Sequence, residues 1–427
     1  MIKKLKNYLS SEFVKNAGKI MTGTVLSQAI PLFAAPVLAR LYTPADYGVL
    51  GLYMSVTSLI SIFSTLQYTN AIIVATNDDE ARSIMNLCIR LTTLFSALTL
   101  LLSFALHNII AVLFKSDMLK YWLLAAPFSI FMGGLTGIFS NYALRTKQFG
   151  LVSRNRVYST IGSTAVSLTV GFLTHHVVGL FAGLWVNQFI NGLLLCTQSL
   201  KSTGDSWKTI LSSGYAEVKN KYINFPKYSL PSDFLNNFIN QIPVFMLNSF
   251  GSLGAIGSFN MSNRILGLPI TFISSAFSEV FRQKAAEDYN AKGSCREIFM
   301  KTFKTLGITS ILPFVILAIF GPQLFSFVLG AKWVEAGRFA QIMSLMYFFR
   351  FTISPLTYVY FVANKLKEDM ILHIVFLLVS FLSFYLGYKL TNSIYYTLLF
   401  YAIGYSFIYV IYFVRSYKYC KNPDHVV

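Results

Sequence analysis

Two arginines lie deep inside apolar segments of the sequence, where a charged side chain needs a specific reason to be. Arg264 is ten residues into the apolar run 254–281, and Arg350 is thirteen residues into the run 337–362. A guanidinium group near the centre of a bilayer costs at least roughly 2.5–3.5 kcal/mol, so it usually faces water, a counter-ion or a substrate. Because arginine presents a planar fork of donors, both positions suit the binding of a phosphate or a carboxylate.

No acidic residue lies at a comparable depth to neutralise these arginines. Asp233 and Glu279 fall near the ends of apolar runs, and Asp46 lies between two runs. We therefore expect both guanidinium groups to face a wet cavity and a bound anion. The alternative is a structural role, in which the arginines bond to backbone carbonyls of broken helices.

Polar side chains recur at helical spacing within the same apolar runs. Residues three or four positions apart share one face of a helix, so these side chains form stripes that can line a cavity. Amides and hydroxyls can also hold helices together, at about 0.6 kcal/mol each, and this alternative stays open for any single amide. The residues expected beside the two arginines are Gln28, Asn240, Gln241, Asn260, Asn263, Tyr347, Ser354 and Tyr358.

The elements that position these residues are long apolar runs. The chain has 427 residues, of which 55% are hydrophobic and 12% charged, whereas a soluble domain carries about a quarter charged residues. Many runs reach the roughly 20 residues needed to cross a bilayer. We therefore predict an all-α polytopic membrane protein with about twelve transmembrane helices. The spans are expected near 18–41, 47–75, 84–106, 121–144, 151–174, 177–200, 228–249, 254–281, 303–329, 337–362, 370–388 and 393–415.

Basic residues predict the orientation of these spans. With the N-terminus in the cytoplasm, 27 lysines and arginines fall on the cytoplasmic side and 6 on the outer side. Positive charge gathers in cytoplasmic loops of membrane proteins, so both chain ends are predicted to be cytoplasmic. Residues 1–13 place apolar side chains on one helical face, which predicts a short helix in the membrane interface before the first span. A frayed basic tail is the alternative.

The longest connector divides the chain into two halves. Residues 201–227 join an N-terminal six-helix lobe, 1–200, to a C-terminal six-helix lobe, 228–427. Since each half has six spans, the second half enters the membrane in the same sense as the first. Parallel repeats of this kind hold substrate between their halves, so we expect a central cavity there.

A weak internal repeat supports this division. The segment 30–33, Ile-Pro-Leu-Phe, matches 242–245, Ile-Pro-Val-Phe. Further on, the segment 47–53 matches 253–259 in its glycine and apolar positions. Two short matches in the same order suggest duplication.

The patterns of enzymes and metal sites are missing from the sequence. There is no HExxH motif, no phosphate-cradling glycine loop and no nucleophile–base pair. Four cysteines without CxxC spacing read as reduced thiols. His175 and His176 read as a solvated turn, with a metal pair as the alternative, and the acidic segment 78–80 reads as a solvated loop, with a gating contact as the alternative. We expect no catalytic residue, metal or cofactor, and no nucleic-acid partner, because the net charge of +18 is spread over short loops.

Several segments resemble a known family of transporters. Residues 16–73, and above all LARLYTPADYGVLGLY at 38–53 followed by NDDEA at 77–81, resemble the start of bacterial oligosaccharide-lipid flippases. These are the O-antigen and capsule exporters of the multidrug/oligosaccharidyl-lipid/polysaccharide exporter superfamily. Residues 329–350 resemble the segment that enters the tenth helix of that family. The motifs separate this family from most transporters, but they do not separate its members by substrate.

The resemblance implies a fold, a cargo and a location. It implies two six-helix lobes around a central cavity that opens to each side of the membrane in turn. The cargo would be an undecaprenyl-pyrophosphate-linked oligosaccharide, moved to the periplasmic leaflet of the bacterial inner membrane for O-antigen (lipopolysaccharide) or other surface polysaccharide synthesis. Membrane lipids, a polysaccharide polymerase and a chain-length regulator are candidate partners. Acids reported in the cavities of relatives have no obvious counterpart here, which puts proton coupling through such a residue in doubt.

Two other functions remain as alternatives. A drug/cation antiporter of the same superfamily would need a buried carboxylate, and arginines at mid-depth would repel its cargo. A membrane polysaccharide polymerase would be expected to carry a large outer loop. The longest outer loop here, near 107–120, has about fourteen residues and no catalytic cluster.

Overall fold

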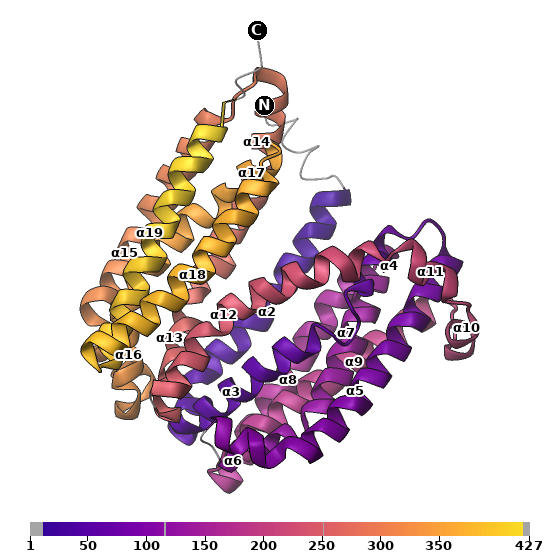
Figure 1. Cartoon of the computed structure of the whole chain (residues 1–427), viewed down its shortest axis with the longest axis horizontal. Helices are drawn as coiled ribbons and strands as arrows, with labels where there is room; N and C mark the ends of the chain where they lie inside the picture. The colour runs from indigo at the N-terminus through magenta and orange to yellow at the C-terminus, as the bar shows by residue number, and fades with distance from the viewer. Residues whose placement is uncertain (1–11, 115–116, 251, 422–427) are drawn as a thin grey trace. The chain divides into compact units, whose positions relative to one another are not determined.

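The computed structural model of the chain describes residues 12–114, 117–250 and 252–421, and these are folded almost entirely into helices (Figure 1). No β-strand occurs in these ranges, where Ser294 and Lys421 form a single isolated bridge. The predicted interfacial helix at 1–13 lies outside the described residues, apart from its last two positions, which open the first described helix.

Each predicted span falls on helical segments, but the span 47–75 is broken: α3 ends at Ser61, residues 62–67 form turns, and α4 begins at Ala71. Eight helices of the described chain are long and apolar enough to cross a membrane. The remaining four predicted spans fall on the shorter helices α3, α7, α12 and α16. The prediction of an all-α polytopic membrane protein is therefore confirmed. The helices are α2 (Glu12–Leu41), α3 (Pro44–Ser61), α4 (Ala71–Val74), α5 (Asp78–Phe114), α6 (Asp117–Leu123), α7 (Ala126–Arg145), α8 (Phe149–Thr174), α9 (Val178–Thr203), α10 (Trp207–Ser212), α11 (Ala216–Lys221), α12 (Leu230–Phe250), α13 (Leu253–Pro269), α14 (Ser275–Lys292), α15 (Arg296–Leu329), α16 (Val334–Ile353), α17 (Val359–Val362), α18 (Leu366–Thr391) and α19 (Ile394–Tyr419).

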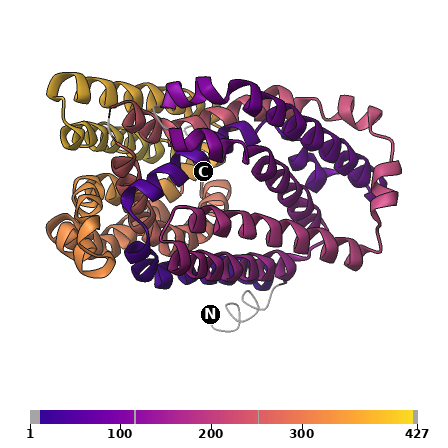
Figure 2. The same ribbon diagram turned by 90° about the horizontal axis from the view of Figure 1, so that it is seen from below.

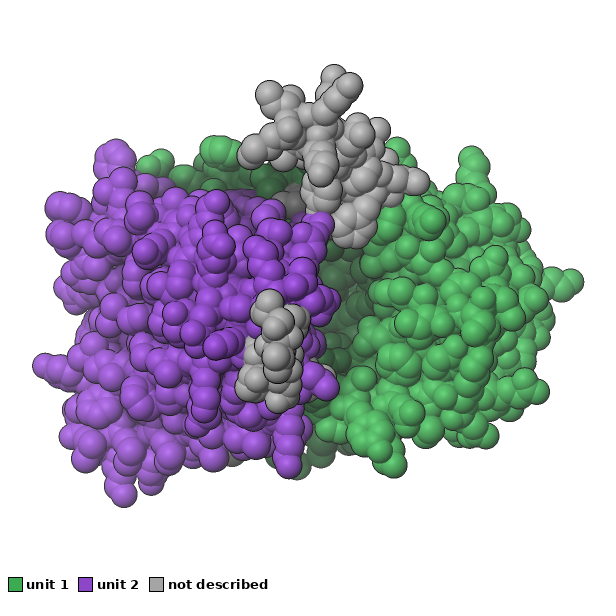
Figure 3. All heavy atoms as spheres, turned by 90° about the horizontal axis from the view of Figure 1, so that it is seen from above, with its two compact units in different colours: residues 1–42, 49–238 green, residues 43–48, 239–427 purple. Residues whose placement is uncertain are grey.

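The chain forms two compact units, shown in different colours in Figure 3. Unit 1 comprises residues 1–42 and 49–238, and unit 2 comprises residues 43–48 and 239–427. Residues 43–48, which belong to unit 2, lie between α2 and the main part of α3, which both belong to unit 1. The predicted domain limits at 1–200, 201–227 and 228–427 stay a prediction.

Unit 1 is held together where small residues let helices approach closely. Tyr42 is fully buried, and its hydroxyl donates a 2.6 Å hydrogen bond to the backbone carbonyl of Ser167 in α8. A Cβ atom at Gly171 or Gly179 would lie 2.6 Å or 2.0 Å from that hydroxyl oxygen. Glycine at these two positions therefore lets α8 and α9 close around the tyrosine that follows α2.

Unit 2 packs α15 against α16 and α18 against α19 (Figures 1 and 2). The run 303–329 contains Pro313 and Pro322, yet α15 continues through both. Gly321 in α15 meets Gly337 in α16 so closely that a Cβ at Gly337 would lie 2.5 Å from the carbonyl oxygen of Gly321. The second proline thus lies at a close crossing of two helices, where neighbouring packing supports the helix.

Two predicted spans of unit 2 change their helical form partway. After Pro269, residues Ile270–Ser274 form a turn of π-helix between α13 and α14. After Ile353, residues Ser354–Tyr358, with Pro355 in the second position, form a 3₁₀ turn between α16 and α17. Such local changes of winding occur often at functional sites.

Candidate functional site

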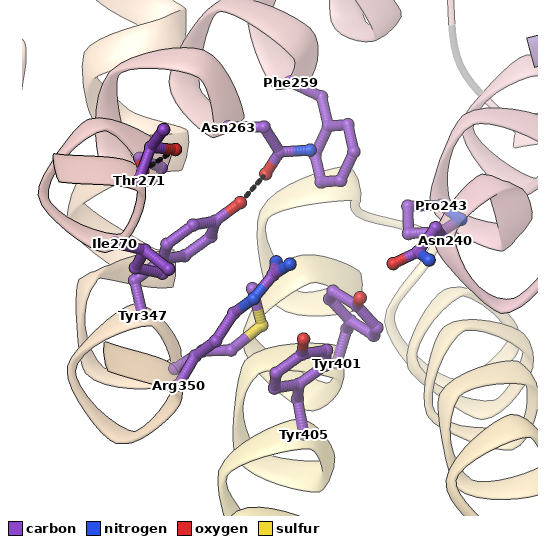
Figure 4. Close-up of a pocket in the computed structure, with 12 residues that line it drawn as sticks. Asn240, Pro243, Phe259, Asn263, Ile270, Thr271, Tyr347, Arg350, Tyr401 and Tyr405 are labelled. Carbon is purple, nitrogen blue, oxygen red and sulfur yellow. Dashed lines mark hydrogen bonds between the residues drawn. The ribbon is translucent and has the colours of Figure 1, made fainter. Parts of the chain in front are cut away.

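A pocket of about 310 Å³ opens inside unit 2, among α12, α13, the π-turn, α16 and α19 (Figure 4). All of its walls come from residues 240–405, so it belongs to this unit alone. Its size is near the lower end for small-molecule sites, which suits a single sugar ring or a phosphate group. The pocket is lined by Asn240, Pro243, Phe259, Asn263, Gly267, Ile270, Thr271, Met346, Tyr347, Arg350, Tyr401 and Tyr405.

The local sequence explains why space opens here. Gly267 carries no side chain, and a Cβ atom there would find no heavy atom within 4 Å. Two residues later α13 ends at Pro269 and the wider π-turn begins, and the hydroxyl of Thr271 donates a 3.1 Å hydrogen bond to the carbonyl oxygen of Gly267. On the facing wall, Pro243 lies inside α12. Gly267 and Pro243 in the lining, and the wide turn after Pro269, therefore leave space between the larger side chains of the other walls.

Arg350 brings the charge into this pocket. Its side chain extends from α16 toward the space between Tyr347 and the pair Tyr401 and Tyr405 (Figure 4). The guanidinium carbon lies 5.6 Å from the ring centroid of Tyr347, within the range of a cation–π interaction. The lining around it includes Tyr347 of α16 and Tyr401 and Tyr405 of α19. None of the twelve described lining residues is acidic.

Neutral polar groups complete the site. The hydroxyl of Tyr347 donates a 2.9 Å hydrogen bond to Oδ1 of Asn263 (Figure 4), so the amide nitrogen of Asn263 is left to face other partners. Asn240, from α12, supplies a second amide. A cation among amides and phenols can hold an anion and hydrogen-bond sugar hydroxyls, but these lining residues include no nucleophile with a base. The arrangement suits binding rather than bond breaking.

The structure brings together four of the predicted residues. Asn240, Asn263, Tyr347 and Arg350 all line the pocket. Their role in binding stays a prediction, because the arrangement by itself does not show a ligand.

The other predicted residues lie elsewhere. Arg264 is exposed on α13, outside the pocket lining. Its guanidinium group interacts electrostatically with the Tyr47 hydroxyl. Gln28 is exposed on α2 of unit 1. Four more belong to unit 2 but not to the lining, and for them too substrate binding stays a prediction: Gln241 in α12, Asn260 in α13, and Ser354 and Tyr358 in the 3₁₀ turn.

Sequence reasoning missed Tyr401 and Tyr405. Both lie in the last apolar run, four residues apart, and Tyr409 and Tyr412 continue the same helical face of α19. Neighbouring rings along it are 5.6, 5.1 and 6.1 Å apart. Four tyrosines on one face of a span form a polar stripe, the same signal that indicated Tyr347 and Tyr358 in the run 337–362.

The acidic segment 78–80 pairs with bases of its own unit. Arg145 lies 3.2 Å from Asp78, and Arg82 lies 2.8 Å from Asp79. Glu80 pairs with Lys221 of the predicted connector. The segment predicted as a solvated loop is therefore the start of α5 and part of an ion-pair network.

Comparison with known proteins defines the class of this fold. The lipid II flippase MurJ in an inward closed conformation matches with a TM-score of 0.72 and 16% identity, over 93% of this chain and 87% of that one. A multidrug resistance MATE family transporter, in an inward-facing conformation, matches with a TM-score of 0.65 and 14% identity over 93% of both chains. A MOP superfamily transporter from Pyrococcus furiosus matches with a TM-score of 0.62 and 12% identity, over 94% of both chains. The fold is that of these membrane transporters.

The sequence places the chain more closely. The family described as Polysaccharide biosynthesis protein matches residues 37–338, and the chain belongs to this family. A search of curated proteins finds no match. The resemblance to flippases of the exporter superfamily is thus confirmed at the level of family and fold.

Proposed function

We propose that this protein is a flippase for lipid-linked oligosaccharides. It moves undecaprenyl-pyrophosphate-linked repeat units from the cytoplasmic to the periplasmic leaflet by alternating access, for O-antigen or another surface polysaccharide. The observation that carries the proposal is the pocket of unit 2, where Arg350 lies among tyrosines and amides and none of the described lining residues is acidic. A family of polysaccharide biosynthesis proteins and a fold like that of a lipid II flippase support the same cargo class.

Each lining group has a proposed task. Arg350 holds a phosphate or the carboxylate of an acidic sugar, because its fork of donors matches two oxygens at once. Tyr401 and Tyr405 offer ring faces to a sugar, and Asn240 and Asn263 hydrogen-bond its hydroxyls. Arg264, outside the pocket, is a second contact for the anion during passage. Gln28, Gln241, Asn260, Ser354 and Tyr358 are proposed as further contacts along the path of the glycan.

The setting of the flippase follows from the charge pattern. We assign it to the bacterial inner membrane with both ends in the cytoplasm, since 27 basic residues then face inward and 6 outward. Two six-helix lobes, 1–200 and 228–427, joined by 201–227, would form the cavity that opens to each side in turn. A polysaccharide polymerase and a chain-length regulator are proposed partners.

Multidrug transporters share this fold, so the charge of the pocket decides between two cargo classes. A drug/cation antiporter needs a site that attracts a cation, usually a carboxylate. The twelve described residues that line this pocket include an arginine and no acid. Positive charge in a low-dielectric site favours an anionic cargo, which supports the flippase.

The proposal is tested by replacing the arginine in cells. With Arg350→Ala we expect export of surface polysaccharide to fall at least tenfold, because the anion loses its charged partner. Arg350→Lys should keep part of the export, since it keeps the charge and loses the fork. Arg338 lies on the same helix outside the pocket lining, so Arg338→Ala is the matched control and should export normally. Unchanged export by Arg350→Ala, inserted at the parental level, would refute the proposal.

A further inference from the structure

The inner side of the connector 201–227 packs against the other elements of unit 1. Ile210 and Val218 are buried in one hydrophobic cluster with residues of α5 and α7. The hydroxyl of Tyr68 donates a 2.9 Å hydrogen bond to the carbonyl oxygen of Lys219. These contacts make the connector, with α10 and α11, a defined surface of unit 1 rather than a loose link.

A series of contacts shows that the connector runs along α5. Asp205 lies 2.8 Å from Arg82. One turn further along α5, Nδ2 of Asn86 donates to the backbone carbonyls at 211 and 213, at 3.2 and 2.6 Å. One more turn on, the guanidinium of Arg90 lies 5.0 Å from the ring centroid of Tyr215. From position 82 to position 90 the connector therefore follows α5 for about 12 Å, at 1.5 Å per residue.

The charges of α5 show where this stretch lies relative to the bilayer. Arg90 is the last charged residue of α5, and the remaining 24 residues, 91–114, carry none. A helix of this length spans about 36 Å, enough for the roughly 30 Å hydrocarbon core. Arg90 thus marks the edge of the hydrocarbon. The connector beside positions 82–90 lies at the height of the lipid headgroups, with Tyr215 nearest the core.

The outer side of the connector presents apolar and basic side chains together. Trp207, Leu211 and Tyr215 are 40%, 42% and 37% exposed. Aromatic residues of this kind gather where a membrane meets water. Lys208 on α10 and Lys219 on α11 are exposed beside them. Asp205 and Glu80 are already paired with Arg82 and Lys221. The connector carries one further acid, the exposed Glu217 of α11, against five lysines, so its charge is net positive.

We propose that this side of the connector is a binding surface for anionic phospholipid, separate from the transport pocket. Its apolar side chains enter the upper part of the leaflet while the lysines meet lipid phosphates. A basic residue near an anionic membrane strengthens binding about fivefold. The lipid would hold the connector and the adjoining ends of α5 and α9 at a fixed height. The connector face consists of Trp207, Lys208, Leu211, Tyr215, Lys219 and Ile223.

The depth of the connector face in the membrane is tested with the full chain in nanodiscs of brominated phospholipid. The signal of Trp207 is the difference between the parent and Trp207→Phe, which removes the background of the other tryptophans. We expect brominated lipid to quench Trp207, with the strongest effect from bromines high on the acyl chain. A tryptophan at 215, Tyr215→Trp in the Trp207→Phe background, should be quenched by deeper bromines. The surface proposal is overturned if Trp207 is quenched by aqueous acrylamide and by no brominated lipid.

Charge preference is tested by comparing brominated phosphatidylglycerol with brominated phosphatidylcholine at equal mole fraction. In the parent we expect stronger quenching of Trp207 by phosphatidylglycerol, a preference that weakens in high salt. Lys208→Gln and Lys219→Gln should each lower the preference about fivefold. Lys120→Gln and Lys389→Gln, in α6 and α18, are matched controls that should leave it unchanged. Equal quenching of the parent by the two lipids would overturn the anionic part of the proposal.

Discussion

Arginines have opposite surroundings in the two units. In unit 1, Arg82 lies between Asp79 and Asp205, 2.8 Å from each. In unit 2, Arg350 has tyrosines around it, and no acid is found among the residues that the structure describes in the pocket lining. The first is a structural charge, because its donors are already used by carboxylates. The second keeps donors for a ligand, at the cost of carrying a charge among weakly polar groups.

This contrast separates two uses of one residue type. A paired arginine stabilises the elements that hold its partners, here α5 and the connector, and its loss leaves an acid unpaired. An arginine among phenols and amides stabilises little, but it offers an anion a charged and partly dry site. We therefore expect substitutions in unit 1 to change stability and substitutions in the pocket to change binding.

The largest effect is expected from giving the pocket the acid it lacks. Asn263→Asp places a carboxylate beside Tyr347, in the pocket that holds Arg350. The new charge competes with a ligand and repels it, so affinity for pyrophosphate should fall by about 2–3 kcal/mol, roughly a hundredfold. Calorimetry on the purified chain measures it. Asn263→Ala, which removes the hydrogen bond without adding charge, should lose much less; equal losses would show that charge does not govern the pocket.

A smaller effect, on stability, is expected in unit 1. Arg82→Gln leaves Asp205, whose side chain is 6% exposed, without its charged partner. The free energy of unfolding should fall by about 1–3 kcal/mol, read as a lower thermal midpoint in detergent. Pyrophosphate binding by the folded protein should stay at the parental level. A large loss of binding with unchanged stability would reverse the roles assigned to the two arginines.

The phenol hydroxyls of α19 are expected to contribute less. Tyr405→Phe keeps the ring and removes one hydrogen-bonding group, so sugar binding should weaken by about 0.5–1.5 kcal/mol. Titration with glucuronate checks this value. Tyr396→Phe, on the same helix outside the pocket lining, is the matched control. If both variants bind alike, Tyr405 does not contact the sugar through its hydroxyl.

The smallest effect concerns pH. Burial favours the protonated form of Asp205, but hydrogen bonds from Tyr142 and Arg82 outweigh it and hold its pKa below the ordinary value. A carboxyl with a lowered pKa contributes stability above its unfolded pKa, about 4, and loses it as the pH falls through the folded pKa. The difference in stability between Asp205→Asn and the parent should therefore become smaller only below about pH 4. Melting curves from pH 7 to 3 measure this difference, and a difference that stays constant with pH would contradict the assignment.

Much of the fold could be predicted from the sequence, because it depends on local patterns. Most apolar runs form a continuous helix, and even α15 follows the predicted span despite Pro313 and Pro322, whereas the run 47–75 is broken between Ser61 and Ala71. Four candidates, Asn240, Asn263, Tyr347 and Arg350, meet in one pocket, since polar groups inside spans gather where helices leave space.

The rest depends on how helices pack. Arg264 and Arg350 have similar depth in the sequence, yet only Arg350 lines the pocket, because the rotation of α13 is set by its contacts with α16. Tyr401 and Tyr405 enter the site through the register of α19 against α16. The ion pairs of the acidic segment 78–80 join residues far apart in sequence, such as Glu80 and Lys221, so no local sequence pattern indicates them.

The central claim, that Arg350 is available to an anion, is tested most directly by pyrophosphate binding to the purified chain. Calorimetry should show saturable binding by the parent, a loss of at least tenfold with Arg350→Ala, and partial recovery with Arg350→Lys. Arg82→Gln should bind as the parent does. Equal affinity of the parent and Arg350→Ala would contradict the account.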